Sequence, residues 1–191
     1  MTAAMPSAIV PLNLDVNLDA FLASVEGRAY RMALLATRER ADALDIVQDA
    51  MLRLVQHYRD RTSAEWPALF QRILQNRILD WHRQQQRSKR WLVWLKSVNE
   101  DDEAEQALED IPDTREHNPA ELLARAADMD TVLRVVEALP IRQQQAFLLR
   151  AWEGLDTAAT AAAMECSEGA VKTHYFRALQ TLRSALQAEA P

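Results

Sequence analysis

One stretch without glycine or proline, from Leu69 to Arg90, limits most strongly what this chain can fold into. Its apolar side chains recur at steps of three and four, which places them on one face of an α-helix. Past Trp81 this apolar stripe stops and cations replace it. The opposite face carries Arg72, Gln75, Asn76, Asp80 and Arg83. We expect a helix with one end anchored in a core and the other presenting cations and amides, groups that bind phosphates and bases. An ordinary amphipathic helix with a solvated basic end is the alternative.

The same helical period recurs along most of the chain. Only three residues are glycine, and period-two alternation is hard to find. These features predict an all-α protein. In the segment from Arg40 to Tyr58, a predicted core stripe consists of Leu44, Val47, Met51, Leu54 and Tyr58. Other helices are expected from about Asp15 or Asn17 through Leu35, over Ala64–Arg90 and 122–139, from Pro140 toward Gly154, from Thr157 to Met164, and from Ser167 to about Gln187.

Charge divides the chain into unequal parts. Residues 64–97 carry seven Lys/Arg against two Asp/Glu, whereas residues 98–121 carry one Arg against ten Asp/Glu. The acidic stretch also contains proline and few large apolar residues, which is typical of a linker. We therefore expect two small helical domains joined by an acidic linker, with the boundaries 1–17 for a loose tail, 18–97, 98–121 and 122–191. This uneven distribution of charge says more about domains and binding surfaces than the net charge of −6 does.

The second domain is expected to end in a helix-turn-helix. Asp156 or Thr157 can cap a short alanine-rich helix, Glu165 and Cys166 make a tight connection, and Ser167 can cap the last helix. The early turns of that last helix would enter a major groove. The candidate DNA-contacting residues there are Ser167, Glu168, Lys172, Thr173, Phe176 and Arg177. A plain helical hairpin is the alternative.

Four motifs together resemble a bacterial RNA polymerase sigma factor of the extracytoplasmic-function group. Residues 42–53 resemble the pattern D-A-x-D-hydrophobic-V-Q-D/E-x-F-L-R, and residues 69–83 resemble the family's −10 helix. Residues 138–150 resemble the entry to the second conserved domain, and residues 167–178 resemble S-x-G-T-V-K-S-R-hydrophobic-x-R-A. The resemblance covers about residues 18–90 and 125–186, in the family's order.

This resemblance implies roles for three groups of residues. A helix bearing Asp42, Asp45, Gln48, Asp49 and Arg53 would dock on core RNA polymerase. Asn76, Arg77, Asp80, Trp81, Arg83 and Arg87 would contact the −10 strand, and the residues of the last helix would face the −35 duplex. It also implies promoter DNA and an anti-sigma factor as partners. Ala170 and His174 depart from the family pattern, and so does Glu165, where glycine is usual.

No pattern for chemistry of the chain's own is visible. The four histidines are dispersed, and neither a metal-ligand spacing, a phosphate-binding glycine loop nor a nucleophile constellation occurs. We expect no cofactor, no metal and no enzymatic activity. A single cysteine suits a reducing cytoplasm, and we expect neither a signal peptide nor membrane insertion. A stand-alone helix-turn-helix regulator and an interaction protein held by a partner are the competing functions.

Overall fold

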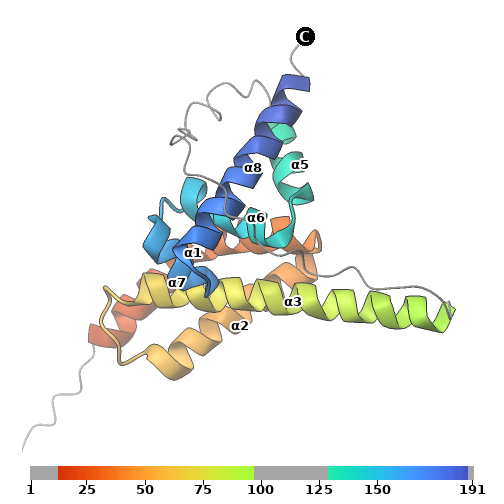
Figure 1. The fold of residues 1–191 in the computed structure, drawn as a ribbon. Coiled ribbons are helices and arrows are strands. Elements are labelled where there is room, and N and C mark those ends of the chain that lie inside the picture. The colour runs from red at the N-terminus through yellow and green to blue at the C-terminus, as the bar shows by residue number, and fades with distance from the viewer. Residues whose placement is uncertain (1–12, 97–128, 189–191) are drawn as a thin grey trace, which may run out of the picture.

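The computed structural model describes the backbone of residues 13–96 and 129–188. All regular structure in these two ranges is helical, so the all-α prediction is confirmed (Figure 1). Residues 1–12 of the expected tail and the whole acidic linker lie outside the described residues, as do residues 122–128 of an expected helix. The expected tail was too long, because residues 13–17 already belong to α1.

The N-terminal unit consists of α1 (Asn13–Thr37), α2 (Arg40–Tyr58) and α3 (Trp66–Lys96). Trp66, which begins α3, is fully buried and donates its Nε1–H to the backbone oxygen of Tyr58 at 3.1 Å. The ring of Phe21 from α1 lies 5.9 Å from Trp66 and 6.1 Å from Phe70. This aromatic group joins α1 to the start of α3 and fixes where the long helix begins.

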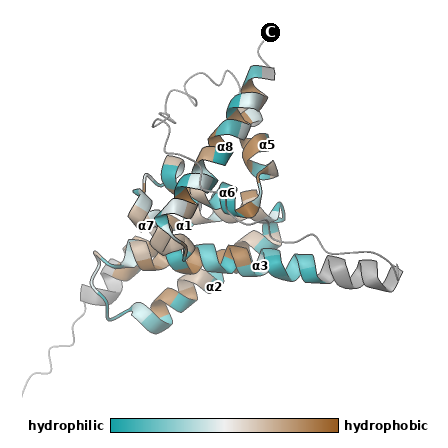
Figure 2. Ribbon diagram, in the orientation of Figure 1, coloured by the Kyte–Doolittle hydropathy of each residue, from teal (hydrophilic) through white to brown (hydrophobic). Residues whose placement is uncertain are grey.

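Along α3, Phe70, Leu74 and Ile78 are buried at the predicted spacing. The helix continues to Lys96, beyond the helices that pack on it (Figure 1). Where α3 leaves the core, its residues are mostly hydrophilic (Figure 2). The backbone from Trp91 to Leu95 extends α3, while the side chains of Trp91 and Trp94 lie outside the described residues.

The C-terminal unit consists of α5 (Met129–Ala138), α6 (Ile141–Phe147), α7 (Thr157–Met164) and α8 (Glu168–Ala188). A π-helical turn, Leu148–Trp152, follows α6 directly, and Gly154 after it has a φ of 69°. The predicted stripe of α8 packs inward, because Val171, Ala178 and Leu182 are each fully buried. The π-helical turn was not expected from the sequence.

The two units share one hydrophobic cluster. It joins buried residues of α1, α2 and α3, such as Ala33, Leu54 and Leu74, to buried residues of α5 and α8, such as Val136 and Leu182. A smaller cluster, which includes Leu149 and Met164, lies within the C-terminal unit. Each unit thus lies directly against the other, with α7 and α6 on α3 and α5 on α1 (Figure 1).

Two expectations about helix faces were wrong. Leu44 was placed in the core stripe of α2, but it is 47% exposed, and the buried positions are Ala43, Ile46, Val47, Ala50 and Leu54. Gln75 was placed on the open polar face of α3, but it is only 2% exposed. The Gln75 amide donates to the Met32 sulfur of α1 at 3.8 Å, and Gln145 of α6 donates to the Gln75 backbone oxygen at 3.0 Å. These long-range contacts leave no mark in the local sequence pattern.

Candidate nucleic-acid interface

A helix-turn-helix is built by α7, the turn at Glu165–Ser167 and α8. The Asp156 carboxylate accepts the Ala159 N–H at 2.7 Å and caps α7, and the Ser167 hydroxyl oxygen accepts the Ala170 N–H at 3.1 Å and caps α8. Between them Glu165 is left-handed, with φ 51° and ψ 51°. The chain therefore makes the sharp turn without glycine, at a cost of about 1 kcal/mol.

Three of the candidate −35 residues are open to solvent on the early turns of α8. Glu168, Lys172 and Arg177 are exposed. Thr173 and Phe176 are half-buried, and the Thr173 hydroxyl donates to the Gly169 oxygen at 3.0 Å. Ser167 serves as the helix cap, so its hydroxyl is already engaged. The exposed face of α8 is thus a carboxylate at the N-terminus followed by two cations.

Next to these residues, His174 is half-buried on α8. Burial lowers the pKa of its imidazole, and the guanidinium groups of Arg142 and Arg177 lower it further. Both effects favour the neutral imidazole on this face of α8.

Four candidate −10 residues line one groove of about 680 Å³ between the units: Asn76, Arg77, Asp80 and Arg83. Arg142, Met164 and Glu165 of the C-terminal unit line the same groove. Within α3, Asp80 lies 3.9 Å from Arg77 and 3.8 Å from Arg83, nitrogen to oxygen. Both arginines thus lie near the Asp80 carboxylate in this groove, although Arg77 also pairs more closely with Asp49 of α2.

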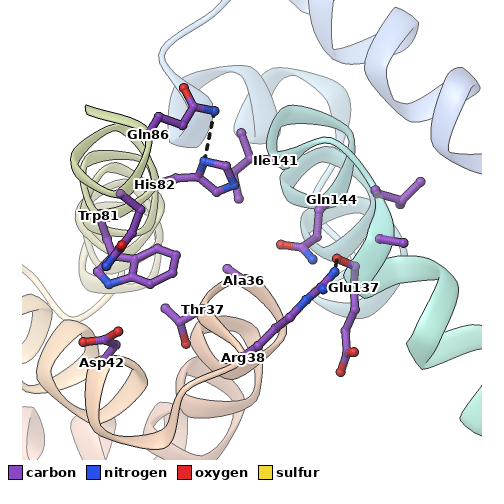
Figure 3. A pocket seen from close by; sticks show the side chains of 13 residues that line it. Ala36, Thr37, Arg38, Asp42, Trp81, His82, Gln86, Glu137, Ile141 and Gln144 are labelled. Atoms are coloured by element: carbon purple, nitrogen blue, oxygen red, sulfur yellow. Dashed lines mark hydrogen bonds between the residues drawn. The ribbon is translucent and has the colours of Figure 1, made fainter. Parts of the chain in front are cut away.

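Trp81 lines a different groove, of about 520 Å³. Figure 3 shows Trp81 and His82 of α3 facing Arg38, in the connection between α1 and α2, and Gln144 of α6 across it. The Arg38 guanidinium donates to the backbone oxygen of Glu137 in α5. The candidate −10 residues are therefore divided between two grooves. Arg87, farther along α3, is exposed and lines neither.

The candidate core-binding residues of α2 also divide into two groups. Asp45 and Gln48 are exposed, while Asp49 is half-buried and pairs with Arg53 at 3.0 Å and with Arg77 of α3. Asp42 is half-buried on the groove that holds Trp81, and Arg53 is exposed on the other groove. Asp49 thus ties α2 to α3, a structural contact that the sequence did not indicate.

Sequence reasoning missed two apolar members of the outer face of α2. Leu44 is 47% exposed and Leu52 is 53% exposed, and they stand at i−4 and i+4 from Gln48. Residues at this spacing share a helix face. Together with Asp45 and Gln48 they form what we call the α2 patch. An apolar pair flanking a polar residue is typical of a protein contact surface.

No group of three or more His, Cys, Asp or Glu side chains in the described ranges is placed to hold a metal ion. Cys166, in the turn before α8, is half-buried, and burial raises the pKa of its thiol. None of the helices within 13–96 and 129–188 is long and apolar enough to span a membrane.

The fold and these surfaces define an all-helical protein with a helix-turn-helix, a class whose members bind duplex DNA. Residues 18–88 match the family described as sigma-70 region 2, and residues 129–182 match sigma-70 region 4. The chain belongs to the sigma-70 family and is a sigma factor of the extracytoplasmic-function group.

Known proteins similar to the chain bear out this membership. It is 29% identical over 169 residues to the RNA polymerase sigma-E factor of Streptomyces coelicolor, covering 84% of each chain. It is 26% identical over 166 residues to the ECF RNA polymerase sigma factor SigD of Mycobacterium tuberculosis, covering 83% of this chain and 71% of that one.

The fold is also similar to that of a solved structure. This is the sigma factor RpoE in complex with the anti-sigma factor NepR from Bartonella quintana, with a TM-score of 0.63 and 18% identity. The alignment covers 91% of this chain and 99% of that one.

Proposed function

We propose that this sigma factor binds core RNA polymerase and directs initiation at promoters by recognising −10 and −35 elements and assisting strand opening. The observation that carries the proposal is the order of the two matched regions, with a helix-turn-helix in the second. The chain acts as a specificity subunit without catalytic chemistry, cofactor or metal, and it works in the cytoplasm.

For core binding we propose the α2 patch, with Asp45 and Gln48 as its polar contacts. Leu44 and Leu52 supply apolar area that is exposed in the free chain. Asp42, Asp49 and Arg53 lie at the border with α3 and hold or extend this surface. An apolar centre with a charged edge is the usual anatomy of a protein interface.

For the −10 element we propose Asn76, Arg77, Asp80, Trp81, Arg83 and Arg87. Arginines neutralise phosphates, and amides and the indole ring can capture an unstacked base. For the −35 duplex we propose the exposed face of α8. There Lys172 and Arg177 contact phosphates or guanines, Thr173 and Phe176 contact apolar base edges, and Glu168 and the capping Ser167 start the helix at the groove.

The proposal also covers the domain bounds and a further protein partner. The domains are 18–97 and 122–191, joined by the acidic linker 98–121, and the helix that opens the first domain extends back to Asn13. We further propose an anti-sigma factor as the partner that keeps the protein inactive, since a structurally similar sigma factor was solved with one.

A stand-alone helix-turn-helix regulator is the competing function. Residues 122–191 carry seven Lys/Arg and eight Asp/Glu, so the domain lacks the positive charge on which independent duplex binding depends. That function also leaves the α2 patch without a purpose. We therefore expect the free protein to bind duplex DNA weakly at physiological salt.

Transcription in vitro with purified core polymerase tests the proposal. Core plus this protein should start transcripts from the promoter of its own operon, whereas core alone should not. Arg177→Ala should lower promoter use about tenfold, because one phosphate or base contact is worth about 1–3 kcal/mol. Arg183→Ala, exposed on the same helix but past the early turns, is the matched control and should have little effect. Tight sequence-specific binding by the free protein, without core, would favour the regulator.

A further inference from the structure

The C-terminal end of α7 is held by a side chain from another helix. The Nη1 group of Arg142, the second residue of α6, donates to the backbone oxygen of Met164, the last residue of α7, at 2.9 Å. The last carbonyl groups of a helix have no partner within that helix, and the helix dipole favours a cation near them. One side chain of α6 thus supplies both the hydrogen bond and the positive charge that suit the end of α7.

For its own helix, Arg142 stands at the unfavourable end. A cation in the first turn of α6 lies near the positive end of the α6 dipole. The side chain is half-buried, and the Gln145 side-chain oxygen, in the next turn of α6, accepts from the same nitrogen at 3.4 Å. This amide holds the guanidinium in place beside α7. The position of Arg142 therefore indicates a role at the end of α7 and not in α6.

The same guanidinium lies close to the turn and to α8. Burial raises the pKa of the Cys166 thiol and lowers that of the His174 imidazole, and the charge of Arg142 acts to lower the pKa of both groups. Arg177 contributes further at His174. A charge has such effects only on groups near it. Arg142 therefore stands where α7, the turn and α8 meet.

The residue whose backbone needs support in this turn is Glu165. It is left-handed, with φ 51°, a conformation that is strained for every residue type with a side chain. The Met164 carbonyl belongs to the peptide plane before Glu165, and the Cys166 N–H belongs to the plane after it. Arg142 holds the first plane, and the Ala161 oxygen holds the second at 3.1 Å. Because peptide groups are planar, fixing both of them fixes φ and ψ of Glu165.

We propose that Arg142 is a positioning residue for −35 recognition, which holds the left-handed turn at Glu165 and thereby sets the angle of α8 against α7. This inference rests on the proposed function for its −35 assignment. It explains how the chain keeps a sharp turn where glycine is usual. Since α8 begins directly after the turn, a relaxed turn would move the exposed residues of α8 away from the base edges and phosphates that they contact.

A direct contact between Arg142 and a DNA phosphate is the competing role. The two roles differ in what glycine at the turn would do. Glycine adopts the left-handed conformation without strain, so it reduces the need for Arg142 in positioning, whereas it cannot replace a phosphate contact. Combining Arg142→Gln with Glu165→Gly in a double-mutant comparison therefore separates the two roles.

Transcription by the holoenzyme is measured on two templates: the promoter of the chain's own operon and the same promoter with its −35 element replaced. Arg142→Gln should lower use of the first template about tenfold, the effect of losing one charge-assisted hydrogen bond, and leave use of the second unchanged. In the Glu165→Gly background the same substitution should lower use of the first template no more than about threefold. A folding defect would instead lower use of both templates together.

Two further variants serve as controls. Arg183→Gln, at an exposed position of α8 beyond its early turns, is the matched control and should leave use of both templates unchanged. Arg142→Lys keeps the charge and can still donate to the Met164 oxygen, because a single nitrogen of Arg142 makes this bond. It should retain most of the parent activity. Circular dichroism checks that each variant keeps its helices.

Amide hydrogen exchange on the free full-length protein tests the turn without DNA. The Cys166 N–H is bonded to the Ala161 oxygen across the turn. It should exchange about tenfold faster in Arg142→Gln, because the turn opens more often once the charge-assisted bond is lost. The double variant with Glu165→Gly should recover part of this protection.

An equal loss of promoter use by Arg142→Gln in the parent and Glu165→Gly backgrounds would overturn the positioning role and indicate a direct DNA contact. Unchanged exchange at Cys166 in the folded Arg142→Gln variant would overturn it too. The parent holoenzyme tests the proposed function separately. If it starts no transcripts, the proposed function fails, and the exchange measurement still decides whether Arg142 holds the turn.

Discussion

Two aspartates on α2 have different surroundings and therefore different roles. Asp45 is exposed beside Leu44 and Gln48, whereas Asp49, one turn later, pairs with Arg53 and with the half-buried Arg77 of α3. The motif that contains both residues does not distinguish them. Only the neighbouring helix shows that one carboxylate is available to a partner and the other is engaged in the fold.

We expect the two positions to respond oppositely to substitution. Asp45→Ala should change the free energy of unfolding by less than about 0.5 kcal/mol and weaken core binding. Asp49→Ala should lower the free energy of unfolding by about 1 kcal/mol, because Arg77 loses its partner on α2. Urea unfolding and a core-binding titration measure the two effects. Normal core binding by Asp45→Ala and by the charge reversal Asp45→Arg would refute its assignment.

We expect His174 to make the free energy of unfolding depend on pH. Its pKa in the folded protein is lowered by burial and by Arg142 and Arg177, so the unfolded chain binds a proton more readily. The stability from the neutral ring is fully present above the unfolded pKa of about 6.5 and is lost as pH falls below it toward the lower folded pKa.

The His174→Gln variant should therefore lose less stability than the parent between pH 7.5 and pH 5.5. Thermal unfolding at several pH values measures this difference. His57→Gln, at an exposed histidine of α2, is the matched control and should follow the parent profile. Parallel profiles for the parent and His174→Gln would show that His174 does not cause the dependence.

Among the elements, the turn of the helix-turn-helix carries backbone strain. Glu165 has φ 51°, a conformation that glycine adopts without penalty. Its side chain is exposed, and other contacts hold the turn. The Ser167 hydroxyl caps α8, the Cys166 N–H donates to the Ala161 oxygen at 3.1 Å, and Arg142 donates to the Met164 oxygen at 2.9 Å. The helix-turn-helix therefore keeps its sharp turn although glutamate stands where glycine is usual.

We expect Glu165→Gly to raise the free energy of unfolding by about 0.5–1 kcal/mol, since relief of the left-handed penalty exceeds the extra chain entropy of glycine. Glu168→Gly, in the first turn of α8, should lower it by a similar amount, because glycine in a regular helix is unfavourable. Urea denaturation of both variants compares the signs. A destabilised Glu165→Gly would mean that the carboxylate makes a contact that outweighs the strain.

Helix positions were largely predictable because they depend on local spacing. The bounds of α2, Arg40–Tyr58, agree with the expected segment, and the caps Asp156 and Ser167 were recognised by type. The faces of helices were less predictable. Leu44 follows the apolar period but lies on the surface, and Gln75 is polar but buried, because partners and distant helices decide which face is covered.

For the candidate site too, single exposed residues were predictable from the sequence, whereas contacts between distant helices were not. Exposure agrees with the expectation for Asp45, Gln48, Lys172 and Arg177. The division of the −10 residues between two grooves, and the pairing of Asp49 with Arg77, follow from contacts between helices far apart in sequence. No local pattern encodes such contacts. The π-helical turn at Leu148–Trp152 is a further example, since its residues read as ordinary helix.

At the scale of the whole molecule, the two sigma regions behave as one folded body. Buried residues of both regions belong to one hydrophobic cluster, and the interface also buries Gln144 and Gln145. Separate domains with independent cores would unfold separately. A shared cluster couples their unfolding, because loss of one unit exposes apolar surface of the other.

We therefore expect one cooperative transition in urea for the free protein. Trp66 reports on the N-terminal unit, where it is fully buried, and Trp152 reports on the C-terminal unit, where it is 38% exposed beside Arg31. In two variants that each keep one of these tryptophans and replace the others with phenylalanine, the fluorescence midpoints should coincide. Adding Gln145→Glu should move the midpoints apart, because the buried Gln145 amide donates to the Gln75 backbone oxygen of α3 at 3.0 Å and a carboxylate cannot. Distinct midpoints without that substitution would show that the regions fold independently, and that the contact between them contributes little to the stability of either.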